Sequence, residues 1–73
     1  MSRALFAVKV FDNINDAMDY ADKLQAEYSR NEMAGNMVKI NGRYHVGVGK
    51  FNVKTPTLDD KDRDAMRRRW IER

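Results

Sequence analysis

The sequence contains no cysteine and a single histidine, His45, among its 73 residues. The absence of cysteine excludes disulfides and thiolate metal ligands, and one imidazole cannot build a zinc site by itself. Small domains often depend on disulfides or a bound metal for stability. Because this chain can form neither, its stability must come from packing, helix capping or self-association. We therefore expect no cofactor and no metal, and we expect homodimerisation as one means of adding buried surface.

Long apolar runs are also lacking. The N-terminal apolar stretch is interrupted by Lys9 and followed by Asp12, so it is too short for a signal peptide or a membrane span. Together with the absence of cysteine, this predicts a cytoplasmic protein without a membrane partner. A chain of 73 residues can build one core, and we expect one domain over residues 1–73.

Motifs for catalysis, nucleotide binding and metal binding are absent as well. Four aspartates recur at intervals of three or four residues (Asp12, Asp16, Asp19 and Asp22), but no calcium-binding loop accompanies them. We interpret them as a solvated helix face whose charges favour the helix dipole. The sequence thus predicts a binding protein and not an enzyme.

The hydrophobic pattern predicts a strand over residues 4–11 and a helix over residues 14–30. In the strand, Phe6, Val8 and Val10 share one wholly apolar face, which we expect to be the core face. Asn13 is a favourable N-cap for the helix, and Gly35 can take the positive φ that lets the chain turn after it. The apolar stripe of the helix comprises Ile14, Ala17, Met18, Ala21, Leu24 and Tyr28.

The dipeptide Asn41–Gly42 between two alternating apolar runs predicts a type I′ hairpin joining strands over residues 36–40 and 43–51. Five side chains of the hairpin are expected in the core: Val38, Ile40, Tyr44, Val46 and Val48. Gly47 and Gly49 then lie on the outer face, where a second chain or a ligand could approach the backbone. Thr57 begins an approximate capping box for a helix over residues 58–72, which either packs through Met66 and Trp70 or projects.

These elements predict an α+β fold of order βαββα, with a three-stranded sheet containing antiparallel strands. The first helix should cover one face of the sheet, and the second helix is basic. The run Tyr44-His45-Val46-Gly47-Val48-Gly49-Lys50-Phe51, with the spaced residues Ala17, Ala21 and Leu24, resembles the SPOR domain over residues 5–51. That resemblance implies a βαββ body and a sheet whose outer face binds a glycan or another partner.

Charge is distributed unevenly. Residues 1–60 hold eight basic and eight acidic residues, whereas residues 61–73 hold six basic and three acidic ones, so the net charge of +3 belongs to the last segment. A local basic patch attracts phosphate backbones or acidic protein surfaces. The candidate binding residues are Arg63, Arg67, Arg68, Arg69, Trp70 and Arg73 on the second helix, with Lys9, Lys39, Arg43 and His45 on the outer sheet face.

The leading hypothesis is a small regulator or inhibitor, of the type found among bacteriophage accessory proteins. It would bind RNA, which is favoured over DNA, or an acidic or nucleic-acid-handling protein, with arginines on phosphates and Trp70 stacked on a base. The alternatives are a SPOR-like module that binds a glycan or protein through its sheet, and a structural homodimer. For the second helix, the plainer interpretation is a solvated helix with internal pairs such as Asp64–Arg68.

Overall fold

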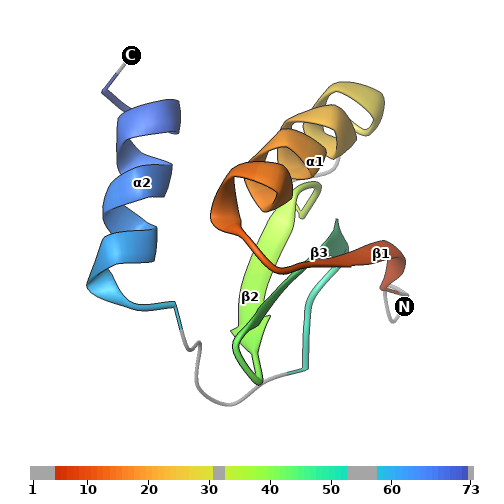
Figure 1. Ribbon diagram of the computed structural model, residues 1–73. Helices are drawn as coiled ribbons and strands as arrows, with labels where there is room; N and C mark the ends of the chain where they lie inside the picture. Colours follow the sequence, from red (N-terminus) through yellow and green to blue (C-terminus); the bar gives the residue numbers. More distant parts are fainter. Residues whose placement is uncertain (1–4, 31–32, 53–57, 73) are drawn as a thin grey trace.

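A computed structural model describes residues 5–30, 33–52 and 58–72 of the chain. Its elements are, in order, β1 (Phe6–Phe11), α1 (Ile14–Glu27), β2 (Asn36–Ile40), β3 (Arg43–Val48) and α2 (Asp60–Trp70). The strands form one antiparallel sheet in the order β1-β3-β2; α1 lies on one face of it and α2 stands at its side (Figure 1). The predicted α+β fold and order of elements are confirmed.

Helix α1 forms where its cap and its apolar stripe predict it. The Asn13 side chain accepts a hydrogen bond of 2.9 Å from the Asp16 N–H, which satisfies a free donor of the first turn. The helix ends at Glu27, three residues before the predicted end at residue 30. Gly35 has a φ of 74°, and a Cβ there would lie 2.8 Å from the Ala21 carbonyl oxygen. Glycine therefore lets the loop pass close beneath α1.

The hairpin between β2 and β3 has the predicted two-residue turn. Asn41 and Gly42 have φ values of 52° and 77°, as a type I′ turn requires. This turn pairs Lys39 with Tyr44 and Met37 with Val46. Directly paired residues share a face of the sheet, so the pairing decides which side chains of β2 accompany the buried Tyr44 and Val46.

The prediction that Val38 and Ile40 face the core with Tyr44 was wrong. Met37 belongs to the buried cluster under α1, whereas Val38 pairs with His45 and lies on the opposite face. The two-residue turn pairs Lys39 with Tyr44, so Lys39 and Met37, and not Val38 and Ile40, share the face of Tyr44. The faces of β2 are therefore the reverse of the predicted ones.

The predicted core face of β1 was also wrong. Val8 and Val10 are 40% and 46% exposed on the other face, whereas Ala7 and Phe11 pack against the core. Phe6 is 43% exposed but lies on the side of α1, where it pairs with Val48 and its ring centre is 5.3 Å from that of Tyr28. Ala7 has a φ of 58°, and the pairing with β3 is irregular between Phe6 and Lys9, which is a β-bulge. Both faces of this strand are largely apolar, so its composition alone could not show which one meets α1.

Gly47 on β3 has a structural role that involves the same chain. A Cβ at Gly47 would lie 2.9 Å from Cγ2 of Val8 and 3.2 Å from the carbonyl oxygen of Phe6. The backbone that closely approaches this glycine is therefore the bulged strand β1. β3 ends at Val48 and not at residue 51, and Gly49 follows it with a φ of 117°.

Helix α2 packs against the body. Its N-cap is Asp59, whose side chain accepts from the Asp62 N–H at 2.9 Å, and the expected capping box began instead at Thr57, which lies outside the described residues. The helix is two residues shorter at each end than the predicted range 58–72. Met66 and Trp70 are half-buried and pack on the core cluster. Of the two predicted alternatives, α2 therefore packs on the body and does not project.

Candidate interaction surfaces

The end of α2 is attached to α1 by a group of polar contacts, here called the clasp (Arg69, Trp70, Asp19 and Asp22). The Arg69 guanidinium donates to Asp19 at 2.6 Å and to Asp22 at 2.8 and 3.0 Å. The indole Nε1–H of Trp70 donates to the second oxygen of Asp22 at 2.7 Å. The i,i+3 spacing places both carboxylates on one side of α1, where a single guanidinium can reach them.

The clasp changes the interpretation of its four residues. The hydrogen bond with Asp19 raises the pKa of Arg69, against the opposing effect of desolvation. Arg69 and Trp70 thus bind α1 within the chain, and Trp70 is not an open platform for a base. The prediction of a solvated acidic face was wrong for Asp22, whose side chain is 37% exposed and bound to both partners.

A second polar group, the Asp62 cluster (Asp62, Tyr44 and Lys39), attaches the start of α2 to the sheet. Asp62 is only 5% exposed, and it accepts from the Tyr44 hydroxyl at 2.6 Å and from the Lys39 ammonium at 3.3 Å. Neither of these contacts was predicted from the sequence. A core-facing tyrosine requires a partner for its hydroxyl, and that requirement was the available signal.

The ionisation of the Asp62 cluster follows from its contacts. Burial by itself would raise the pKa of Asp62, but the hydrogen bonds from Tyr44 and Lys39 outweigh it and lower that pKa below 3.8. Burial, followed by the bond to the carboxylate, raises the pKa of Tyr44, and the hydrogen bond to Asp62 raises the pKa of Lys39. The cluster therefore holds an ionised carboxylate, a neutral phenol and an ammonium around neutral pH.

The outer side of α2 carries the remaining candidate arginines. Arg67 and Arg68 each lie 3.2 Å from Asp64, and Arg67 also lies 3.5 Å from Glu72. The predicted Asp64–Arg68 pair is thus confirmed. Arg63 is exposed as well, whereas Arg73 lies outside the described residues. Exposed ion pairs are weak, so these arginines stay accessible, but nearby carboxylates offset much of their charge.

The four basic candidates on the sheet do not share one face, and that prediction was wrong. Lys9 and Lys39 lie on the side of α1, where the Lys9 ammonium is 5.0 Å from the centre of the Tyr20 ring. Arg43 and His45 lie on the other side, and Arg43 is 3.4 Å from Asp12. The sheet therefore presents no continuous basic surface.

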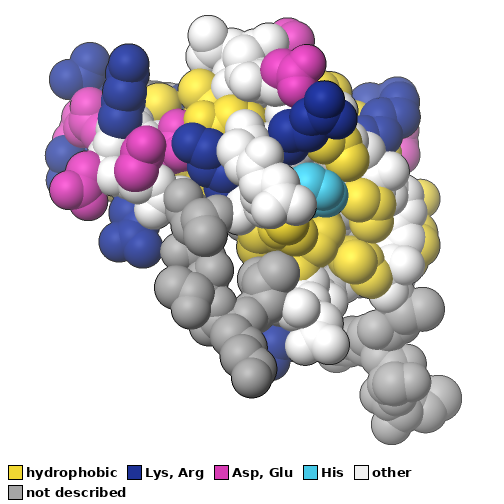
Figure 2. Space-filling model, turned by 60° about the horizontal axis from the view of Figure 1, so that its bottom comes forward, with side chains coloured by type: hydrophobic (Ala, Val, Ile, Leu, Met, Phe, Trp, Pro, Cys, Tyr) yellow, Lys and Arg dark blue, Asp and Glu magenta, His cyan; other side chains and the backbone are white. Residues whose placement is uncertain are grey.

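The face of the sheet away from α1, here called the open face (Val8, Val10, Val38, Ile40 and His45), is mainly apolar. Val10, His45 and Val38 form one row across the three strands. Val8 and Val10 are 40% and 46% exposed, His45 is half-buried, and Val38 is buried. Figure 2 shows hydrophobic side chains gathered around the imidazole of His45 on this side.

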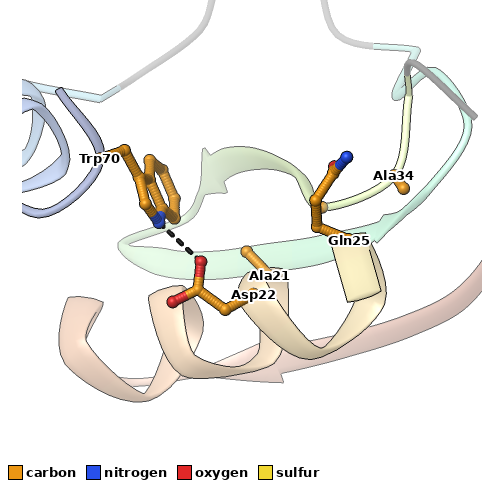
Figure 3. A pocket seen from close by; sticks show the side chains of 6 residues that line it. Ala21, Asp22, Gln25, Ala34 and Trp70 are labelled. Atoms are coloured by element: carbon orange, nitrogen blue, oxygen red, sulfur yellow. Dashed lines mark hydrogen bonds between the residues drawn. The ribbon is translucent and has the colours of Figure 1, made fainter. Parts of the chain in front are cut away.

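A small cleft lies between α1 and the end of α2 (Figure 3). The Trp70 indole forms one wall, Gln25 lies on the far side, and Ala21 lies between them. Its volume is about 260 Å³, and small-molecule sites usually occupy roughly 300–1,000 Å³. The carboxylate in its wall, Asp22, is already bonded to Trp70 and Arg69. The cleft has room for a side chain and offers no group poised for chemistry.

Among residues 5–30, 33–52 and 58–72, no group of three or more histidine or acidic side chains is arranged to hold a metal ion. In the same part of the chain, no helix has the length and apolar character needed to cross a membrane.

No family model, curated protein or solved structure matches this chain. The resemblance to SPOR domains therefore stays a prediction.

Proposed function

We propose that this chain is a non-catalytic binding module that recognises another protein through the open face of its sheet. The observation that carries the proposal is the exposure of Val8 and Val10, next to His45, on a face that no described helix covers. Exposed apolar side chains gathered on one face are typical of protein interaction sites. A module of this kind acts by occupying its partner's surface, as a regulator or an inhibitor does, and the lack of cysteine agrees with a cytoplasmic setting.

The arrangement of charge supports a protein target. Nucleic-acid binding needs several basic groups directed at phosphates. Here Arg69 is committed to the clasp, Lys39 to Asp62, and Arg43 lies beside Asp12. On the open face the charged side chain among the described strand residues is Arg43, which lies at one end of it, 3.4 Å from Asp12, so a phosphate backbone finds few basic groups to bind there.

A second candidate function is RNA binding by the outer side of α2. Arg63, Arg67 and Arg68 are exposed on this helix, and the side chain of Arg68 is 73% exposed. Binding of this kind would weaken steeply with added salt, whereas binding through an apolar face would not.

The test compares two variants, Val10→Asp and the double change Arg67→Ser with Arg68→Ser, expressed with an affinity tag in the source cells. Circular dichroism first establishes that both variants fold. We expect a protein partner in stoichiometric amount with the wild type and the arginine variant, and its loss with Val10→Asp. Co-purified nucleic acid that a high-salt wash removes, and that the arginine variant lacks, would overturn the proposal in favour of RNA.

A further inference from the structure

Strand β1 is an edge of the sheet and carries most of the exposed large hydrophobic side chains. Within the described residues, β1 pairs with β3 and with no other strand. Among the described residues, five large hydrophobic side chains are exposed, and four of them are on or next to β1: Leu5, Phe6, Val8 and Val10. An apolar edge strand with free backbone donors and acceptors is a template for pairing with another strand.

Charged side chains and bulges usually prevent an edge strand from pairing with another chain, and β1 has little of this protection. A single charged residue, Lys9, lies in β1, and its ammonium is drawn over the Tyr20 ring on the side of α1. The bulge disturbs the Phe6 end of the strand, but the pairing of Lys9 to Phe11 is regular. The part of β1 from Val8 to Phe11 is therefore suited to accept a neighbour.

The opposite edge of the sheet lies on the side of α2. Lys39 on β2 is 3.3 Å from Asp62 and 3.9 Å from Asp59, at the start of that helix. Residues 61–72 hold five basic and three acidic residues, so this side of the sheet, away from β1, has an excess of positive charge. Two copies that met at β1 would keep their basic helices at the far ends of the assembly.

We propose that β1 pairs with β1 of a second copy of this chain, in antiparallel orientation, and forms a continuous six-stranded sheet. A two-fold axis perpendicular to the sheet makes the contact self-complementary, as in most homodimers. Like charges directly opposite each other are unfavourable, so the register does not place Lys9 opposite its copy. The registers on either side of the excluded one, with Val8 or Val10 opposite the same residue of the second copy, meet this condition and keep most of β1 paired.

This inference rests on the proposed function, because it enlarges the open face toward the area that a protein interface takes. Strands lie about 4.8 Å apart and rise about 3.3 Å per residue, so three strands of about six residues present roughly 300 Å². A standard protein interface takes about 800 Å² from each partner. Joining two sheets at β1 doubles the open face to roughly 600 Å², closer to that size, and places Val8 and Val10 of both copies at its centre.

Sedimentation equilibrium tests the pairing with two matched apolar-to-lysine changes. Val10→Lys places a charge on the β1 edge, whereas Ile71→Lys makes the same change at a residue that is 76% exposed beyond α2. We expect the wild type and Ile71→Lys to dimerise alike and Val10→Lys to dimerise about tenfold or more weakly. A wild type that remains monomeric at about millimolar concentration, which corresponds to roughly 4 kcal/mol of binding free energy, would overturn the proposal. Equal effects of the two lysines would do the same.

Cysteine cross-linking gives an independent measurement, since the natural chain has no cysteine. Opposite residues of antiparallel strands have Cα atoms about 4.5–5.5 Å apart, which a disulfide can span. We expect Val8→Cys or Val10→Cys to form a disulfide-linked dimer under mild oxidation, and Arg68→Cys on α2 to remain reduced. Cross-linking at neither position of β1, or equally at Arg68, would overturn the pairing.

The two proposals fail in different ways. A wild type that stays monomeric, but loses its protein partner with Val10→Asp, would refute the dimer and leave the proposed function intact. A β1-linked dimer that captures no protein would refute the proposed function and leave the dimer intact.

Discussion

From the contacts of the Asp62 cluster we predict that Tyr44→Phe lowers the free energy of unfolding substantially. Tyr44→Phe removes one hydroxyl and leaves the ring in place, so the main loss is the 2.6 Å hydrogen bond to a carboxylate that is only 5% exposed. Hydrogen bonds to charged groups contribute about 1.5–3 kcal/mol. Asp62 keeps its contact with Lys39 at 3.3 Å, so the expected cost lies at the lower end, about 2 kcal/mol.

That loss is large for a chain of this size. Domains are stable by about 0.05–0.15 kcal/mol per residue, which is roughly 4–11 kcal/mol here. One kcal/mol shifts the melting temperature of a domain of this length by about 4–8 °C, so Tyr44→Phe should lower it by about 8–16 °C. Urea and thermal unfolding followed by circular dichroism measure both quantities.

Tyr20→Phe is the matched control. The Tyr20 hydroxyl donates at 2.6 Å to the carbonyl oxygen of Ala7, a neutral acceptor, and its loss should cost about 0.5–1.5 kcal/mol. In an Asp62→Asn background, where the acceptor is neutral too, Tyr44→Phe should cost no more than this. If Tyr44→Phe costs the same as Tyr20→Phe in the wild-type background, the charge on Asp62 adds nothing to the strength of its hydrogen bond with Tyr44.

Further predictions concern the clasp, the bulge and pH. Arg69→Ala should cost about 1–2 kcal/mol in urea unfolding, less in 1 M salt, whereas Arg68→Ala should cost under about 0.5 kcal/mol; equal losses would contradict the clasp. Gly47→Ala places a Cβ 2.9 Å from Val8 and should cost about 1–3 kcal/mol, most of it recovered by adding Val8→Ala; a failure to recover would assign the strain elsewhere. The folded-state pKa of Asp62 lies below the ordinary 3.8, so its contribution is complete above 3.8 and is lost as the pH falls through the lower folded value. Unfolding from pH 6 to 2 should show this loss in the wild type and less of it in Asp62→Asn.

The proposals divide the surface between two kinds of contact. We propose that the apolar open face and the β1 edge bind proteins. RNA binding by the outer side of α2 is the second candidate. Val10 has the central place in this scheme, because it belongs both to the open face and to the edge strand. The variants at Val10 therefore test both the proposed protein binding and the proposed dimer.

The sequence alone determined the features that depend on neighbours along the chain. Asn13 and the apolar stripe specify α1, and Asn41–Gly42 specifies the hairpin turn, because caps and turns are made by residues a few positions apart. The order of elements, and hence the α+β class, follows from these local signals. The sequence also located the charge excess in residues 61–73.

Only the tertiary structure decided which side of each strand faces α1 and what the charged residues contact. Apart from Lys9, both faces of β1 are apolar, and pairing with β3 across the bulge at Ala7 decides which of them meets α1. Arg69 meets Asp22 and Asp19, which are 47 and 50 positions away, and Asp62 meets Tyr44, 18 positions away. Periodicity carries no information about such pairs, because they form only when packing brings distant segments together. The residues predicted to bind a partner thus became, in part, the contacts that fix α2 to the fold.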